Sequence, residues 1–77
     1  MFEHHAIRRM AERGIAPDSV HFVLDDPEWS VEADSPGYRQ YVRRINGKPL
    51  SVIAKLEIGG GAAIKSCYWM EEEDCNE

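Results

Sequence analysis

Three basic side chains near the start of the chain have the types and spacing that acid–base chemistry on a phosphate needs. His5, Arg9 and Arg13 follow one another at intervals of four residues, so on a helix they lie along one side. A histidine titrates near neutral pH and can act as a general acid or base. Two guanidiniums beside it can bind a phosphate and stabilise developing negative charge. The stripe therefore contains the parts of a metal-independent ribonuclease.

The same three residues also have a structural interpretation, which is the more frequent one. Long arginine side chains often lie along the edge of a core with their charged ends in solvent. Glu12, or carboxylates on a sheet, can serve as ion-pair partners. Spacing alone does not decide between a catalytic stripe and a packed, paired helix side.

A second candidate site is the segment 38–44, in which aromatic residues alternate with arginines. Aromatic rings stack on bases and arginines contact phosphates, so the pattern suits single-stranded RNA. The more common alternative is a strand with one aromatic core face and one solvated basic face. The residues expected to bind substrate are Tyr38, Arg39, Tyr41, Arg43, Lys48 and Tyr68.

The segment Ser66-Cys67-Tyr68 could present a hydroxyl or a phenol to the same site. In the favoured alternative, Ser66 is a tolerated small residue and Tyr68 is a core residue. Nothing near Cys67 indicates a lowered thiol pKa, which a nucleophilic cysteine requires. We therefore do not expect Cys67 to be a nucleophile.

No metal or cofactor is expected. His4 and His5 are adjacent, so on a helix their side chains diverge by about 100°. Neither His21 nor Cys75 completes a zinc-type spacing with them. The glycine run 59–61 is not followed by the Lys-Ser/Thr pair of a phosphate-binding loop.

Two helices are predicted in the first third of the chain. Phe2, Ala6 and Met10 recur every four residues and form an apolar stripe. Gly14 fits the left-handed position that ends a helix. A second helix is predicted from Pro17, a residue that suits the first helical position, to the Asp-Asp pair at 25–26, which precedes a proline.

The remainder predicts four strands joined by short turns. The Asn46-Gly47 pair is a strong hairpin signal, and the alternating apolar residues from Leu50 onward predict a half-buried strand. Consecutive strands with short connections favour an antiparallel meander with the helices on one face. The predicted fold is thus α+β, with strands at Trp29–Ala33, Tyr38–Ile45, Leu50–Ile58 and Ala62–Met70.

Composition and charge predict one domain, residues 1–70, followed by an acidic tail, residues 71–77. The chain has 77 residues and a formal net charge of -5, but five of its 14 acidic residues follow Met70. Residues 1–70 therefore carry nine acids against nine Lys and Arg. Acidic runs of this kind are usually solvated, so we expect the tail to be disordered.

A cytoplasmic location is predicted from what the sequence lacks. The N-terminus has no basic and apolar regions of a signal peptide. No apolar run approaches the roughly 20 residues of a membrane span. The two cysteines, Cys67 and Cys75, are interpreted as free thiols of a reducing compartment.

The stretch from His5 to Ile15, His-Ala-x-x-Arg-Met-x-x-Arg-Gly-Ile, resembles a family of small prokaryotic proteins known as a domain of unknown function, the 4258 group. That family is similar to RelE/ParE-type toxins and to the barnase–EndoU–colicin–RelE class of metal-independent ribonucleases. The resemblance implies a RelE-like fold. The chain departs from the family at Ala16, where Ser or Thr is usual, and at Ser66, which replaces a Thr.

Two main functional hypotheses follow. The first is a RelE-like endoribonuclease, the toxin of a toxin–antitoxin pair, with His5 as acid/base, Arg9 and Arg13 on the scissile phosphate, and an antitoxin-like protein as partner. The second is a non-catalytic module on the same fold that binds RNA or a protein. A weaker third is a structural protein whose arginines are paired. Neither a membrane partner nor an oligomeric state is predicted.

Overall fold

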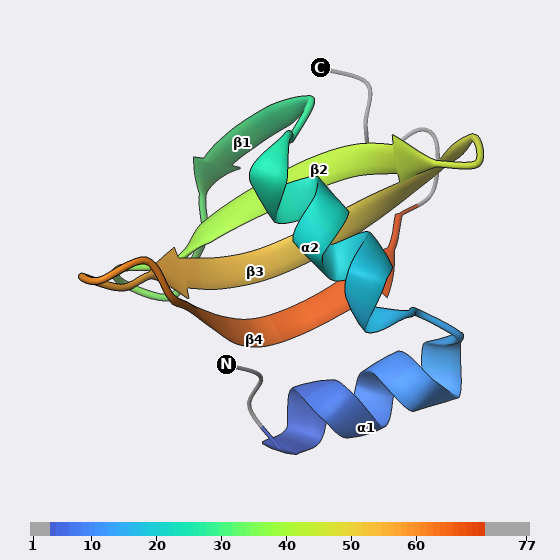
Figure 1. The fold of residues 1–77 in the computed structure, drawn as a ribbon, viewed down its shortest axis with the longest axis horizontal. Coiled ribbons are helices and arrows are strands. Elements are labelled where there is room, and N and C mark those ends of the chain that lie inside the picture. Colours follow the sequence, from blue (N-terminus) through green and yellow to red (C-terminus); the bar gives the residue numbers. More distant parts are fainter. Residues whose placement is uncertain (1–3, 71–77) are drawn as a thin grey trace.

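Two helices precede a four-stranded antiparallel sheet in the computed structural model of the chain, which describes residues 4–70 (Figure 1). The strand order is β1-β2-β3-β4, so every strand pairs with its sequence neighbour. This confirms the predicted α+β meander. The predicted acidic tail and Phe2 lie outside the described residues. The elements are α1 (His4–Arg13), α2 (Pro17–Asp25), β1 (Trp29–Glu32), β2 (Arg39–Ile45), β3 (Lys48–Leu56) and β4 (Ala62–Trp69).

Helix α1 ends in a glycine-centred cap that turns the chain back onto the sheet. Gly14 has a φ of 69°, in the left-handed region. The amide of Ile15 donates to the Met10 carbonyl at 2.9 Å, and the amide of Gly14 donates to the Ala11 carbonyl at 3.4 Å. These are the two bonds of a Schellman motif. Met10 and Ile15 are both 4% exposed, so the cap also brings two apolar side chains into the core.

Helix α2 begins at Pro17 without a side-chain cap, because its N-cap residue is Ala16. A proline at this position costs no hydrogen bond and has the dihedral that the first turn needs. The helix ends as predicted before Pro27, with the Asp26 amide bonded to the Phe22 carbonyl at 3.1 Å. Figure 1 shows α2 crossing the sheet over β2 and β3, while α1 lies along β4.

The hairpin at Asn46-Gly47 forms as predicted, with both residues at positive φ, 54° and 85°. Because this turn has only two residues, Lys48 already pairs with Ile45, and β3 starts two residues before its predicted start. It also ends two residues early, at Leu56. The amide of Glu57 donates to the Gly61 carbonyl at 2.8 Å, which closes the next turn and excludes Ile58 from the sheet.

Three smaller boundaries also differ from prediction, one of them the end of β4, which lies at Trp69 and not at Met70. Strand β2 begins at Arg39, so Tyr38 lies just before the strand, and β1 ends at Glu32. The Ala33 amide donates to the Tyr38 carbonyl at 3.0 Å. This hydrogen bond holds Tyr38 at the end of the β1–β2 turn, although Tyr38 is not a strand residue.

The two faces of the sheet differ in their contacts. Tyr41, Val52 and Cys67 form one row across β2, β3 and β4, and all belong to the core beneath the helices. Val20 and Val23 of α2 are fully buried against this face. Because side chains alternate along a strand, the neighbouring positions point to the opposite, helix-free face. That face carries Val42, Ser51 and Tyr68 in register.

Replacement of Gly14 by alanine tests the helix cap. An L-residue in the left-handed region is strained, so Gly14→Ala should lower the free energy of unfolding by about 1 kcal/mol. Gly61→Ala is the control, because its φ is not positive and a Cβ there meets only an ordinary contact at 3.5 Å. Urea denaturation monitored by tryptophan fluorescence compares the two. Equal losses in both variants would contradict the assigned cap.

Candidate functional site

Arg13, the last residue of the predicted catalytic stripe, is held against β4. Its Nη1 atom donates to the carbonyl oxygen of Cys67 at 2.8 Å. In return, the indole Nε1 of Trp69 donates to the Arg13 carbonyl oxygen at 3.0 Å. These two bonds join the end of α1 to an edge strand. The guanidinium of Arg13 is therefore already bound to a backbone carbonyl of the protein. That Arg13 binds a phosphate stays a prediction from the sequence.

His5 and Arg9 are exposed on α1. Arg9 is one helical turn before Arg13, so the two residues lie on the same side of α1. None of the hollows described below, all formed by residues 4–70, is lined by His5 or Arg9. The structure thus places both residues at the surface, and none of these hollows joins them to Tyr38 or Arg39.

Cys67 is a free, fully buried thiol between the sheet and the helices. Burial raises its pKa, because the thiolate would lose its hydration, and the nearby positive charge of Arg13 opposes that rise only in part. A raised pKa keeps the thiol protonated at neutral pH. A protonated thiol is a poor nucleophile, and nothing in the sequence indicates a nucleophile at Cys67.

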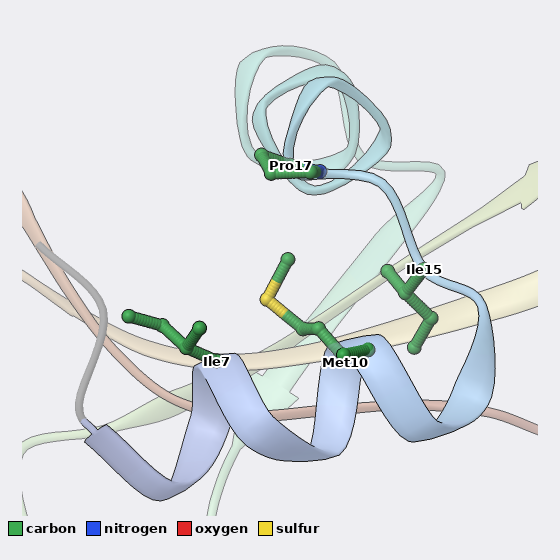
Figure 2. Close-up of a pocket in the computed structure, with 5 residues that line it drawn as sticks. Ile7, Met10, Ile15 and Pro17 are labelled. Atoms are coloured by element: carbon green, nitrogen blue, oxygen red, sulfur yellow. The ribbon is translucent and has the colours of Figure 1, made fainter.

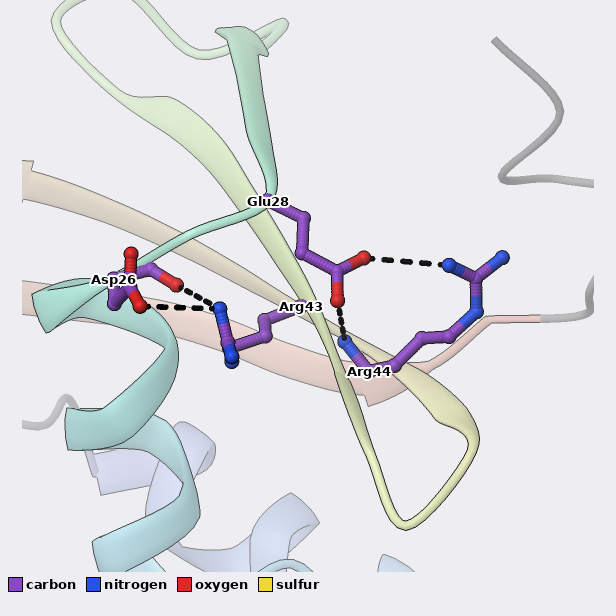
Figure 3. A network of polar contacts seen from close by, with 4 residues as sticks. All are labelled: Asp26, Glu28, Arg43 and Arg44. Atoms are coloured by element: carbon purple, nitrogen blue, oxygen red, sulfur yellow. Dashed lines mark hydrogen bonds and ion pairs between the residues drawn. The ribbon is translucent and has the colours of Figure 1, made fainter.

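Arg43 anchors the end of α2 (Figure 3). Its Nη1 atom donates to the Asp26 backbone oxygen at 2.8 Å and lies 3.3 Å from the Asp26 carboxylate. The guanidinium carbon stands 4.6 Å from the centroid of the Phe22 ring. A cation at a helix C-terminus is stabilised by the partial negative charge of the last carbonyls. Arg43 therefore fixes α2 on β2.

Arg44 points to the other face and binds the segment that leads into β1. Its Nη1 atom lies 3.3 Å from Oε1 of Glu28, and its backbone amide lies 3.5 Å from Oε2 (Figure 3). The two arginines at the end of the Tyr-Arg-Gln-Tyr-Val-Arg-Arg segment thus hold the α2–β1 connection on β2. Two of the three arginines in the segment that suggested RNA binding thus form ion pairs with acidic residues of the protein itself.

The other predicted RNA contacts are spread over several places. Tyr41 is 8% exposed and lies in the core, so stacking on a base would require it to leave the core. Arg39 donates to the Ser30 hydroxyl at 3.1 Å, across the β1–β2 pair. Lys48 lies at the hairpin end of β3, 6.0 Å from the Trp69 ring. Tyr68 is only partly buried on the helix-free face, so the structural alternative that made it a core residue is wrong.

A cluster of polar groups occupies the middle of that face. The Nε2 atom of Gln40 lies 2.9 Å from the Ser51 hydroxyl and 3.1 Å from the Tyr68 hydroxyl. Ser51 is fully buried, so this bond satisfies a hydroxyl that water does not reach. The three residues come from β2, β3 and β4, and they tie the helix-free face together across the sheet.

Two lysines converge on Tyr38 at the edge of the helix-free face. The Nζ atoms of Lys55 and Lys65 lie 5.5 and 5.4 Å from the centroid of the Tyr38 ring, within cation–π range. Lys65 also donates to the Ser35 hydroxyl in the β1–β2 turn. Within the described residues, neither lysine forms an ion pair. We call Ser35, Tyr38, Lys55 and Lys65 the Tyr38 cluster.

A β-bulge contributes to the position of Lys65. Ile53 of β3 pairs with Ser66, but the next residue, Ala54, pairs with Ile64. Lys65 is therefore the extra residue of β4. Bulges of this kind locally bend a strand and re-aim its side chains. Sequence reasoning missed both lysines: Lys55 had a signal, its alternation with Ser51 on the polar side of a strand, whereas nothing in the sequence marks the bulge.

Two hollows flank Ser35 in the β1–β2 turn. One, of about 300 Å³, includes Tyr38 and Arg39 in its lining, and the other, of about 180 Å³, includes Asp34 and Lys65. A third hollow, of about 360 Å³, is apolar and lies between the helices, where Ile7 and Met10 of α1 face Pro17 (Figure 2). The two hollows beside Ser35 thus adjoin the Tyr38 cluster, and the apolar one is at the opposite side of the sheet.

No group of three or more possible metal ligands occurs within residues 4–70. Over the same residues, neither helix has the length and apolar character to cross a membrane.

Replacement of Arg13 tests its structural role. Arg13→Ala removes a charged donor from the half-buried Cys67 carbonyl and should lower the free energy of unfolding by about 1.5–3 kcal/mol. Arg9→Ala removes an exposed arginine from the same helix and should change it by less than about 0.5 kcal/mol. Thermal or urea unfolding distinguishes the two. If Arg13→Ala were as stable as Arg9→Ala, the bond to β4 would not stabilise the fold.

Comparison with known proteins identifies a family and nothing finer. No curated protein matches the chain, and no solved structure does. One family profile, described as a domain of unknown function, DUF4258, matches residues 2–69, which include both helices and all four strands. Because the match covers most of the chain, the protein belongs to the DUF4258 family.

Proposed function

We propose that this domain binds single-stranded RNA on the helix-free face of its sheet, at the Tyr38 cluster. The observation that carries the proposal is the convergence of two lysine ammoniums, without carboxylate partners in the described residues, on one aromatic ring. A cationic group beside an aromatic ring is the combination with which proteins hold a phosphate and stack a base at the same time.

The distribution of charge supports this site over the arginine-rich segment. All nine Lys and Arg residues lie within residues 4–70, and Arg8, Arg43 and Arg44 are paired with acids. Arg13 is bound to a backbone carbonyl. Each lysine ammonium has three donors, and Lys65 uses one of them on Ser35. Lys55 and Lys65 therefore retain donors for a phosphate.

Cleavage of the bound RNA is a second proposal, which rests on the resemblance to RelE-like toxins. It is favoured by the exposure of His5 and Arg9 on α1, the helix that lies along β4, because β4 also carries Lys65 and Tyr68. In this version His5 is the acid/base and Arg9 contacts the phosphate, while Arg13 positions α1. The domain would then be the toxin of a pair whose partner is an antitoxin-like protein.

Neutralisation of the two lysines tests the binding site. For a 12-nucleotide oligouridylate, log K falls with log salt by about 0.7 per phosphate contact. Lys55→Gln and Lys65→Gln should each weaken binding and lower that slope by about 0.7. Arg8→Gln removes one charge from a side chain paired with Glu12 and is the matched control. Fluorescence anisotropy over a salt series gives both quantities.

Two outcomes would contradict the binding proposal. The first is no binding of the oligonucleotide by the wild-type domain at low salt. The second is an equal effect of all three substitutions, because that would show a response to net charge and not to the Tyr38 cluster.

Replacement of His5 tests cleavage separately from binding. If His5 is the acid/base, His5→Ala should reduce the rate of RNA cleavage by about 100-fold or more, while its affinity for the oligonucleotide stays unchanged and a cooperative unfolding transition shows that the variant is folded. His4→Ala is the control, because it removes the adjacent exposed histidine. Gel assays in the presence of EDTA exclude metal-dependent contaminants. A wild-type domain that binds RNA but does not cleave it would leave only the binding module.

A further inference from the structure

The smaller hollow beside the Tyr38 cluster is lined by acidic, basic and apolar residues. A site for a phosphate alone would not need an acidic or an apolar residue. It has a volume of about 180 Å³ and contacts the Tyr38 cluster through two shared residues, Ser35 and Lys65. This is below the roughly 300–1,000 Å³ of sites for drug-sized ligands, and it suits a single planar ring system. Its lining residues are Ala33, Asp34, Ser35, Ile53, Lys65 and Ser66.

Asp34 is the acidic residue among those that line the hollow, and its charge restricts the groups that can bind there. An ionised carboxylate has acceptors only, and it repels a phosphate. The ammonium of Lys65, on the same lining, has donors only. A ligand that satisfies both must present adjacent N–H donors to Asp34 and a carbonyl oxygen to Lys65. Ile53 adds an apolar surface for the face of a ring.

Among the four RNA bases, guanine alone meets this requirement along one edge. Its Watson–Crick edge carries two neighbouring donors, the ring N1–H and the exocyclic N2 amino group, followed by the O6 acceptor. Adenine and cytosine each place a ring acceptor beside their single amino group, and uracil has one N–H between two carbonyls. Proteins that bind single-stranded RNA specifically read splayed-out bases on this edge.

We propose that this hollow, the Asp34 pocket, takes one guanine base of the bound RNA, with Asp34 accepting from N1 and N2 and Lys65 donating to O6. The inference rests on the proposed RNA-binding function and adds base specificity to it. The phosphate beside the guanine is then held outside the pocket by Lys55, against the ring of Tyr38. Ser35 and Ser66 line the same pocket and can donate to or accept from the base.

The experiment compares RNA 12-mers of uridine that carry one central guanosine, inosine, adenosine or cytidine. Since a good bidentate base contact discriminates by about 1–3 kcal/mol, the guanosine oligonucleotide should bind wild-type protein roughly five- to 100-fold more tightly than the adenosine or cytidine ones. Inosine keeps N1–H and O6 but lacks the N2 amino group, so its affinity should be intermediate. Anisotropy titrations at one fixed salt concentration give these ratios.

Asp34→Asn assigns the preference to the pocket. It replaces a carboxylate oxygen by a donor, so the guanosine preference should be lost, while binding of plain oligouridylate should be unchanged or slightly tighter because one negative charge is removed. Asp18→Asn, an exposed acid at the start of α2, is the control and should retain the preference. Unfolding midpoints of both variants show that the fold is intact.

The outcomes separate this inference from the function on which it rests. Equal binding of all four oligonucleotides by wild-type protein would overturn the guanine pocket and leave RNA binding in place. A guanosine preference that persists in Asp34→Asn would overturn the assignment to Asp34. Binding of none of the four would overturn the proposed function, and the pocket with it.

Discussion

The packing of two short helices on a single face of the sheet is the constraint on which the rest of the structure depends. Helices of 10 and 9 residues bury one apolar row, Tyr41, Val52 and Cys67, together with its neighbours. Because both helices pack on that face, the second face receives no helix from the described residues. The strands carry two groups of polar side chains on that second face. One consists of Gln40, Ser51 and Tyr68, and the other is the Tyr38 cluster.

The arginines and the lysines have different places in the structure. Arginines hold the helices on the sheet, whereas two lysines lie on the helix-free face. Guanidiniums present several donors in a fixed fork and suit carbonyl and carboxylate partners. Arg13 and Arg43 use this geometry on Cys67 and Asp26, where they attach α1 to β4 and α2 to β2. Ammoniums are compact and strongly hydrated. Lys55 and Lys65 lie together on the helix-free face, where a hydrated cation can meet a ligand.

The contacts by which Arg43 holds the end of α2 include both unfavourable and favourable contributions to stability. The Nε atom of Arg43 is buried without a hydrogen-bond partner among the described residues, which is unfavourable for a charged group. The Phe22 ring beside the guanidinium and the two Asp26 oxygens offset this loss. Because Arg43 is already occupied in this way, releasing it to bind RNA would expose the end of α2.

Much of the fold was predictable because it depends on local chemistry. The Schellman cap at Gly14 and the turn at Asn46-Gly47 follow from residues that tolerate positive φ. Strand ends were less predictable: β3 is displaced by two residues because pairing across a tight turn, and not alternation alone, decides where a strand begins. The candidate site was predicted less well, since only Tyr38 and Tyr68 of the predicted RNA contacts lie on the polar helix-free side.

By itself, the sequence determined the element order, the helix cap and the hairpin, because each depends on residue type and on neighbours a few positions away. Only the tertiary structure decided which arginines bind the protein itself and which lysines lie beside Tyr38 without an ion pair in the described residues. The contacts of Arg13 and Lys65 span 54 and 30 residues of sequence, and Lys65 is also the extra residue of a bulge. Sequence periodicity gives no information about contacts between residues so far apart in the chain. The stripe of His5, Arg9 and Arg13 suggested a catalytic site, but its last residue binds a backbone carbonyl of β4.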